Sequence, residues 1–339
     1  MEKLYIPEPY SAGILLTYKC TSACKHCLYA CSPEWKADFL SLEDAERILS
    51  QLAEKMRGKY PFPGRIGVND GIHFTGGEPF MNFELLLQVV RIAAELDMPS
   101  RFVETNAAWC IDDETTREKL RALREAGLHG ILISANPFTL EYVPFERTER
   151  AARIAREVFP PYNVIVYQGL FYEQFRQLGL KGTLVFEDYL RIGGGALQYM
   201  ELFASGRAAY ALSYLFPRHP AERFFGMSCR NELIRDWHIH VDNYGNFMPG
   251  FCGGLSLGDA RELDTLCREG IDLDERPVLK ALLTDLKDLY DLGKQFGYEE
   301  MEEGYVSKCH LCLDIRRHLV QRGDFKELQP RVFYEHLGG

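Results

Sequence analysis

The segment that decides the fold is GILLTYKCTSACKHC, residues 13–27, which joins an apolar run to a loop containing three cysteines. The run Ile14–Tyr18 has the length and apolar character of a buried strand. Cys20, Cys24 and Cys27 follow it with the spacing C-x3-C-x2-C. Thiolates this close together can bind three irons of a cubane [4Fe-4S] cluster, which leaves the fourth iron without a protein ligand. An open coordination position indicates chemistry rather than a purely structural metal site.

A second motif follows the expected strand Ile72–Thr75 and has the sequence Gly76, Gly77, Glu78, Pro79. Paired glycines let the backbone approach a ligand closely, and the glutamate supplies an anionic acceptor beside it. The cysteine loop and this turn together resemble the radical S-adenosylmethionine (radical SAM) superfamily. The resemblance implies that the open iron binds the amino and carboxylate groups of S-adenosylmethionine, and that the four residues of the turn contact this cofactor.

Cys31 leaves alternatives open, because it extends the spacing to C-x3-C-x2-C-x3-C. Four such thiolates could form a closed zinc site or a closed electron-transfer cluster. If Cys31 is not a ligand, its place near the expected active site makes it a candidate catalytic residue that donates a hydrogen atom or binds substrate. A buried structural thiol is the other interpretation.

The overall composition allows a large core and limits the classes of partner. The chain has 339 residues, of which 46% are hydrophobic, and a formal net charge of -10. This length permits two domains, and the negative charge argues against binding nucleic acid or an anionic membrane through a broad basic surface. No segment has the length of a membrane span, and residues 1–10 lack the apolar core of a secretory signal. We therefore expect a cytoplasmic protein with reduced cysteines.

Short apolar runs alternate with amphipathic helical patterns from residue 13 to about residue 170, which predicts repeated βα units. Ser41 is expected to cap the first helix, Asn82 to start the second, and Gly127 to close a third. Together with the family resemblance, the pattern predicts an α/β fold, a partial (β/α)6 TIM-like barrel spanning residues 1–215. A sixth strand is expected at Leu184–Phe186 or Ala196–Leu202. The five other expected strands are Ile14–Tyr18, Ile72–Thr75, Phe102–Thr105, Ile131–Ser134 and Val164–Tyr167.

Polar residues follow the expected strands, at the edge where sites collect in barrels of parallel strands. Glu104 and Asn106 end the third strand, and Ser134 and Asn136 end the fourth. The family resemblance implies that Ser134 and Asn136 bind the ribose of S-adenosylmethionine, and that Glu104 or Asn106 lies near its sulfonium-methionine part. Each could instead be a strand-end cap or a turn residue.

Residues 216–339 have no βα pattern and contain a second set of cysteines, and we expect a small C-terminal α+β iron-sulfur domain there. An alternating strand at 237–242 and a turn lead into the second cysteine of the set. This arrangement resembles the auxiliary-cluster extension called twitch, a smaller relative of SPASM, and Ser205–Ala208 resembles a Gly-Arg-Ala element of these enzymes. The resemblance implies one auxiliary [4Fe-4S] cluster, although zinc with the same ligands stays open. The expected ligands are Cys229, Cys252, Cys309 and Cys312.

Other metal-binding side chains have simpler explanations. His238 and His240 point the same way on the expected strand and could bind metal, but packing or hydrogen bonding is the more common role. Cys110 and Cys267 are expected to be small buried hydrophobic residues.

The resemblance implies an oxidoreductase or a peptide- or cofactor-maturation enzyme. It would reductively cleave S-adenosylmethionine to a 5'-deoxyadenosyl radical and abstract a substrate hydrogen atom, with the auxiliary cluster supporting oxidation or bond formation. Its expected partners are a peptide or small-molecule substrate and a reducing protein such as ferredoxin or flavodoxin. The alternatives are a non-catalytic iron-sulfur electron carrier and a zinc-stabilised scaffold.

Overall fold

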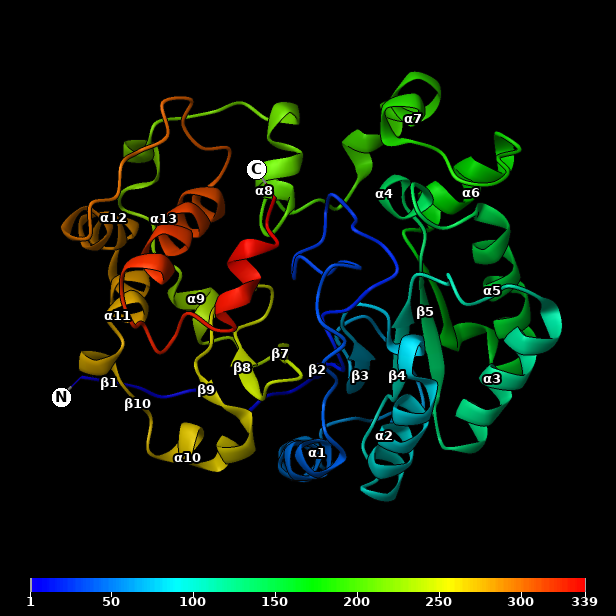
Figure 1. The fold of residues 1–339 in the computed structure, drawn as a ribbon. Coiled ribbons are helices and arrows are strands. Elements are labelled where there is room, and N and C mark those ends of the chain that lie inside the picture. The colour runs from blue at the N-terminus through cyan, green and yellow to red at the C-terminus, as the bar shows by residue number, and fades with distance from the viewer. Residues whose placement is uncertain (1, 339) are drawn as a thin grey trace. The chain divides into compact units, whose positions relative to one another are not determined.

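A computed structural model describes residues 2–338, which divide into two compact units. The first, which we call the βα unit, comprises Tyr10–Cys24 and Cys31–Glu201. The second, the C-terminal unit, comprises the chain up to Pro9, the segment Lys25–Ala30 and the chain from Leu202 onward. Figure 1 shows both. The expected division into domains at residues 215 and 216 stays a prediction.

The βα unit is built on a parallel sheet in the order β6-β5-β4-β3-β2. The residues of β2 and β3 are all buried, as expected for parallel strands covered on both faces, and in β3 these include the polar side chains of His73 and Thr75. The α/β fold with a parallel sheet is therefore confirmed. The strands are β2 (Ala12–Leu15), β3 (Ile72–Thr75), β4 (Phe102–Thr105), β5 (Gly130–Ser134) and β6 (Val164–Tyr167).

The first strand ends earlier than its apolar run predicts, at Leu15 rather than Tyr18. Leu16 still donates its backbone N–H to the carbonyl of Thr75, at 3.0 Å. Beyond this point β3 ends and the chain turns at Gly76 and Gly77. The carbonyl of Thr17 therefore accepts a hydrogen bond from Gly77 in this turn and does not continue the strand pairing. The boundary is therefore set by the neighbouring turn and not by local hydrophobicity.

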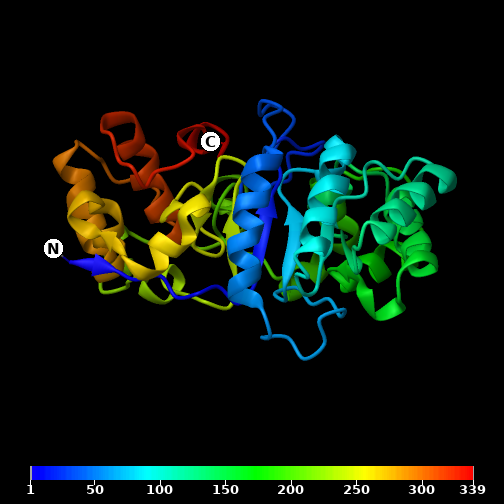
Figure 2. The same cartoon turned by 90° about the horizontal axis from the view of Figure 1, so that it is seen from below.

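The helices of the βα unit begin where the capping residues predict. The Ser41 hydroxyl accepts from the N–H of Asp44 at the start of α1, and the Asn82 side chain accepts from Leu85 at the start of α2. Gly127 has a φ of +106° just after α3, as a closing glycine should. In Figure 2 α1 and α2 lie side by side on one face of the sheet. The helices are α1 (Leu42–Met56), α2 (Phe83–Glu95), α3 (Asp113–Glu125), α4 (Pro137–Leu140), α5 (Phe145–Val158), α6 (Gly169–Gln177) and α7 (Phe186–Gly193).

Neither segment expected to form a sixth strand does so. Val185 is 55% exposed and precedes α7, whose first turn carries acidic side chains that favour a helix N-terminus. Most of the second segment lies in a 3-10 helix, Gly194–Tyr199, in which Tyr199 is 70% exposed. Both apolar runs lack the burial that a central strand requires.

The C-terminal unit combines short strands with a group of helices. The predicted hairpin is present, since β7 (Ile239–Val241) pairs antiparallel with β8 (Asn246–Met248), and Gly245 in the turn has a φ of +83°. In Figure 1 α11, α12 and α13 lie together. None of the helices within residues 2–338 combines the length and apolar character needed to cross a membrane. The remaining elements are β1 (Lys3–Leu4), β9 (Gly258–Asp259), β10 (Ile271–Asp272), α8 (Ala208–Ala211), α9 (Arg230–Leu233), α10 (Leu263–Arg268), α11 (Pro277–Thr284), α12 (Leu286–Gln295) and α13 (Lys308–Arg322).

Candidate active site and four-cysteine site

The glycine turn is hydrogen-bonded to the backbone just before the first cysteine. Gly77 donates its N–H to the carbonyl of Thr17 at 2.7 Å, and Glu78 donates to Lys19 at 3.0 Å. A Cβ atom added at Gly77 would lie 1.8 Å from the Lys19 carbonyl oxygen. Only glycine permits this approach, so the turn and the start of the cysteine loop are fixed relative to each other within the βα unit.

Glu78 holds a buried carboxylate at the centre of this region. The Thr105 hydroxyl donates to both of its oxygens, at 2.9 and 3.0 Å. The backbone N–H groups of Asn106 and Phe80 donate as well, at 2.9 and 3.2 Å. Burial raises the pKa of Glu78 to about 7, against the lowering effect of these hydrogen bonds and of Lys119. A cation placed beside a carboxyl group whose pKa is near 7 lowers that pKa and favours the charged carboxylate.

The side chain of Asn106 connects the end of β4 to the cysteine loop. Its Nδ2 donates to Thr21 Oγ1 at 2.9 Å and to Ser22 Oγ at 3.2 Å, and lies 3.6 Å from the sulfur of Cys20. Its Oδ1 accepts from the N–H of Ala108 at 2.9 Å. The expected place of Asn106 near the cofactor stays a prediction, while the structure gives it contacts that orient a candidate metal ligand.

The cysteine loop leaves and returns at the same place in the βα unit. The N–H of Cys20 donates to the carbonyl of Ser32 at 3.1 Å, next to the bridge between Lys19 and Ser32. Cys20 is 7% exposed, whereas Cys24 is half-buried. Cys31 is 2% exposed, as a structural thiol would be, and its catalytic role stays a prediction.

The third expected ligand of the N-terminal cluster belongs to the C-terminal unit, where the Gly-Arg-Ala element hydrogen-bonds to its backbone. Cys27 is half-buried, and its carbonyl accepts from the backbone N–H of Arg207 at 3.0 Å. The Arg207 guanidinium also donates to the carbonyl of Ala30 at 2.7 Å. Gly206, with a φ of +57°, leaves no room for a Cβ atom, which would lie 2.5 Å from the Leu28 carbonyl oxygen. This positioning role of residues 206 and 207 was not predicted, although the motif itself was the available signal.

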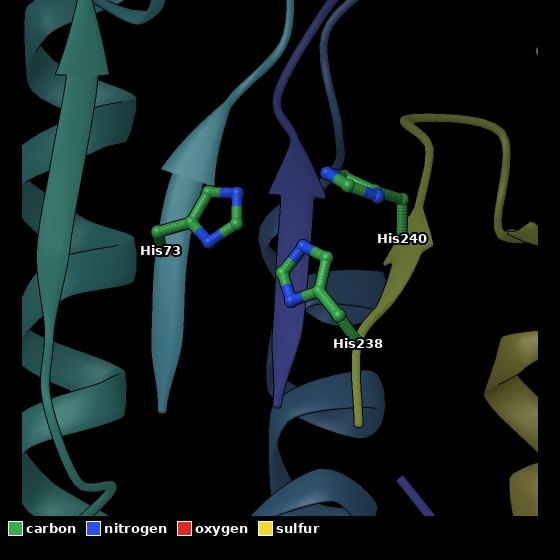
Figure 3. Close-up of side chains that lie close together, drawn as sticks. All are labelled: His73, His238 and His240. Atoms are coloured by element: carbon green, nitrogen blue, oxygen red, sulfur yellow. The ribbon is translucent and has the colours of Figure 1, made fainter. Parts of the chain in front are cut away.

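Glu104 is linked to two residues of the neighbouring strand β3. Its Oε2 accepts from the Thr75 hydroxyl at 2.8 Å, and its Oε1 lies 3.6 Å from Nε2 of His73. Burial lowers the pKa of His73, shown on β3 in Figure 3, to about 3. The imidazole is therefore neutral at pH 7, and its contact with Glu104 is not a salt bridge.

The end of β5 is partly occupied in capping the next helix. Asn136 Oδ1 accepts from the N–H of Phe138 at 3.1 Å and from that of Thr139 at 3.0 Å. Ser134 is half-buried and pairs with Tyr167 in the sheet register. The capping interpretation of Asn136 thus has direct support, and ribose binding by either residue stays a prediction.

The four later cysteines come together in the C-terminal unit. Burial raises the pKa of the Cys309 thiol to about 12, and the charges of Cys252 and Cys312 act in the same direction. Burial also raises the pKa of Cys229, with further contributions from the other three thiols. Such mutual effects require short separations. The donor set of four converging thiols fits either a [4Fe-4S] cluster or zinc.

A lysine places positive charge beside this four-cysteine site. Lys308 pairs with Glu232 at 2.6 Å and donates to the carbonyl of Ser228 at 3.2 Å, next to Cys229. Its charge lowers the pKa of both Cys229 and Cys309, in opposition to the larger effect of burial. Cations near several thiolates favour the deprotonated state that metal binding needs.

The two histidines of the hairpin lie on the same side of β7, as Figure 3 shows. His240 Nδ1 is 2.9 Å from the carbonyl oxygen of Gly250, and the rings of His238 and His240 meet edge-on at 4.7 Å. These contacts fit a packing and hydrogen-bonding role, and the choice between that role and metal binding stays a prediction. Of the two remaining cysteines, Cys110 is buried as predicted, whereas Cys267 is only half-buried.

Comparison with known proteins gives a family match over just under half of the chain. Residues 14–179 match the model of the Radical SAM superfamily. A relative, the PqqA peptide cyclase of Rhodopseudomonas palustris (strain ATCC BAA-98 / CGA009), is 32% identical over 126 residues. That match covers 37% of this chain and 28% of the relative's length.

Two solved structures align with most of this chain at low sequence identity. BtrN in complex with AdoMet and 2-DOIA gives a TM-score of 0.44 at 15% identity, covering 91% of this chain and 99% of that one. Native anSMEcpe with bound AdoMet and Cp18Cys peptide gives a TM-score of 0.43 at 12% identity, covering 93% of this chain and 98% of that one.

Proposed function

Because this chain belongs to the radical SAM superfamily, we propose that it cleaves S-adenosylmethionine reductively at a [4Fe-4S] cluster bound by Cys20, Cys24 and Cys27. The observation that carries the proposal is the hydrogen-bond network joining Glu78, Asn106 and the loop of Cys20. It connects two motifs that lie far apart in the sequence. An electron carrier with a closed cluster has no need for a buried carboxylate beside its cysteine loop.

The residues of the βα unit have separate tasks in this reaction. When bound, the cluster supplies the electron that splits S-adenosylmethionine into methionine and a 5'-deoxyadenosyl radical, which abstracts a substrate hydrogen atom. Glu78 accepts hydrogen bonds from the cofactor's ammonium group, and the Gly76–Gly77 backbone and Pro79 shape the turn beside it. Ser134 and Asn136 bind the ribose, and Glu104 lies toward the methionine part. Asn106 orients the cysteine loop, because its amide contacts Thr21 and Ser22.

The C-terminal unit supplies an auxiliary [4Fe-4S] cluster in this proposal. Its ligands are Cys229, Cys252, Cys309 and Cys312, whose thiols influence one another's pKa. A cluster at this site can accept an electron from the substrate radical or bind the substrate. Zinc bound by the same thiols would serve only as structural support. Measurement of iron, sulfide and zinc in protein purified without oxygen separates the two cases.

The substrate class that we propose is a peptide. The similarity to a peptide cyclase supports it, although the match covers only 28% of that protein. A small-molecule substrate is the second candidate. We further propose a reducing partner such as ferredoxin or flavodoxin and a cytoplasmic location, which reduced thiols require.

The test is anaerobic reconstitution with iron and sulfide, followed by reaction with dithionite and S-adenosylmethionine. We expect 5'-deoxyadenosine to form. Replacing both Cys309 and Cys312 with alanine should leave that cleavage measurable while abolishing product from the substrate. Full product yield in the double variant would refute the role of the auxiliary site. Intact clusters without 5'-deoxyadenosine would instead indicate an electron carrier.

A further inference from the structure

One face of α13 carries a buried arginine in addition to two of the four later cysteines. Cys309, Cys312 and Arg316 are separated by three and four residues, so they lie on the same side of the helix. Arg316 is 3% exposed. An arginine this deeply buried is uncommon, because removing its charge from water costs several kcal/mol unless negative groups compensate for it.

The guanidinium also reaches the loop that carries a third cysteine. One of its terminal nitrogens donates to the carbonyl of Gly253 at 3.2 Å and to the hydroxyl of Tyr334 at 3.1 Å. Gly253 directly follows Cys252 in the sequence. Arg316 therefore lies between a cysteine on its own helix and a cysteine on the facing loop.

Carboxylates do not account for this buried charge. Among residues 2–338, no aspartate or glutamate forms an ion pair with Arg316, and its buried Nε has no hydrogen-bond partner. The Cys312 side chain hydrogen-bonds to Arg316, and the thiols of Cys312 and Cys252 are close enough to interact with it electrostatically. The groups that can balance the cation are the thiolates themselves.

We propose that Arg316 is the built-in counter-ion of the four-cysteine site and holds the reduction potential of the bound auxiliary cluster higher than the thiolates alone would allow. The inference rests on the proposed function, which places that cluster there. A cluster gains one negative charge when it is reduced, and a fixed cation nearby stabilises the reduced state. The effect is strong because the surroundings are buried and weakly polarisable. Arg316 acts through the cluster and its ligands, so it is a positioning residue and not a catalytic one.

A purely structural role makes a different prediction. Arg316 could serve only to connect α13 to the loop of Cys252 through the Gly253 carbonyl and the Tyr334 hydroxyl. Tyr334→Phe removes one of these hydrogen bonds and leaves the guanidinium charge in place. Charge compensation predicts an unchanged potential in this variant, whereas the structural role predicts a change.

The first experiment uses protein in which Cys20, Cys24 and Cys27 are replaced by alanine, so that only the auxiliary cluster remains. The midpoint potential is measured by redox titration with electron paramagnetic resonance. Arg316→Gln should lower the ratio of reduced to oxidised cluster at least tenfold at a fixed applied potential, which equals 59 mV for one electron. Arg316→Lys should restore most of the difference. Arg322→Gln, which removes an exposed charge from the end of the same helix, should change nothing.

An unchanged potential in Arg316→Gln, or an equal shift in Tyr334→Phe, would overturn the proposal. A second readout does not depend on iron. Titration of cluster-free protein with Co²⁺, followed by thiolate-to-cobalt absorbance, should show at least tenfold weaker binding in Arg316→Gln than in Arg322→Gln. If iron fails to assemble in the parent protein but this difference is present, the auxiliary cluster is wrong and the role of Arg316 stands. Equal cobalt affinities would refute that role whatever the metal.

Discussion

The carboxylate of Glu78 accepts a hydrogen bond from the backbone N–H of Asn106, with 2.9 Å between nitrogen and oxygen. This contact joins the turn after β3 to the end of β4, and the Asn106 side chain continues it to the cysteine loop. These hydrogen bonds connect three segments, namely the turn after β3, the end of β4 and the cysteine loop. The site is a connected network within the βα unit, so changes at its members should have coupled effects.

The buried carboxyl group of Glu78 should make stability depend on pH. Its pKa is raised to about 7 from an ordinary value of 4.5, so between these values the folded state binds more protons than the unfolded state. The contribution of Glu78 to the stability of the cluster-free protein should therefore fall as pH rises from 4.5 to 7, by up to roughly 3 kcal/mol. Urea unfolding of wild type and variants at several pH values measures this contribution as a difference. The free energy of unfolding of Glu78→Gln relative to wild type should rise over this pH range, and that of exposed Glu84→Gln should not; a difference independent of pH in Glu78→Gln would disprove the assignment.

Asn106→Ala should weaken iron binding at the N-terminal cluster without unfolding the protein. The substitution removes the amide that contacts Thr21, Ser22 and Cys20. Loss of a group that orients a metal ligand typically costs about 10- to 100-fold in metal affinity or activity. The measurement is iron retained during chelator challenge, with Gln198→Ala as a control that removes an exposed amide. Equal retention in the two variants would mean that Asn106 does not orient the loop.

Gly77→Ala should be far more damaging than the same change at Gly195. A Cβ atom at Gly77 meets the Lys19 carbonyl oxygen at 1.8 Å, whereas one at Gly195 has nothing within 4 Å. We expect Gly77→Ala to destabilise the fold by more than about 2 kcal/mol and Gly195→Ala to have an effect within about 0.5 kcal/mol. Thermal unfolding of both variants decides this, and similar melting temperatures would contradict the close approach.

Most strands of the parallel sheet were predictable, and so were the polar residues at their ends. Three of the expected strands, Ile72–Thr75, Phe102–Thr105 and Val164–Tyr167, have the observed boundaries. Each is rich in β-branched or aromatic residues, although Val164–Tyr167 is only half-buried. The sixth strand was not predictable in this way, since the apolar side chains of its two candidate segments remain exposed, as at Val185 and Tyr199.

The residues that support the site were harder to find than the residues expected to form it. Arg207 donates hydrogen bonds to the backbone carbonyl groups of Cys27 and Ala30, and Arg316 donates one to that of Gly253. Backbone acceptors leave no residue-type signal in the sequence. The motif around Arg207 drew attention to it, whereas Arg316 could be found only from its position one helical turn after Cys312.

Cys31→Ala tests whether the N-terminal cluster has an open iron. Cys31 is buried and hence at least partly structural, so we expect a loss of stability of about 1 kcal/mol. The iron and sulfide content of the reconstituted N-terminal site should be unchanged, because three cysteines suffice as ligands. Loss of the cluster in this variant would show that Cys31 closes the site.

The most direct measurement for the central claim is the formation of 5'-deoxyadenosine by the reconstituted protein with dithionite and S-adenosylmethionine. The account predicts that the wild-type chain forms it and that a variant with Cys20, Cys24 and Cys27 replaced by alanine does not. Wild-type protein with its N-terminal [4Fe-4S] cluster intact that formed no 5'-deoxyadenosine would contradict the account.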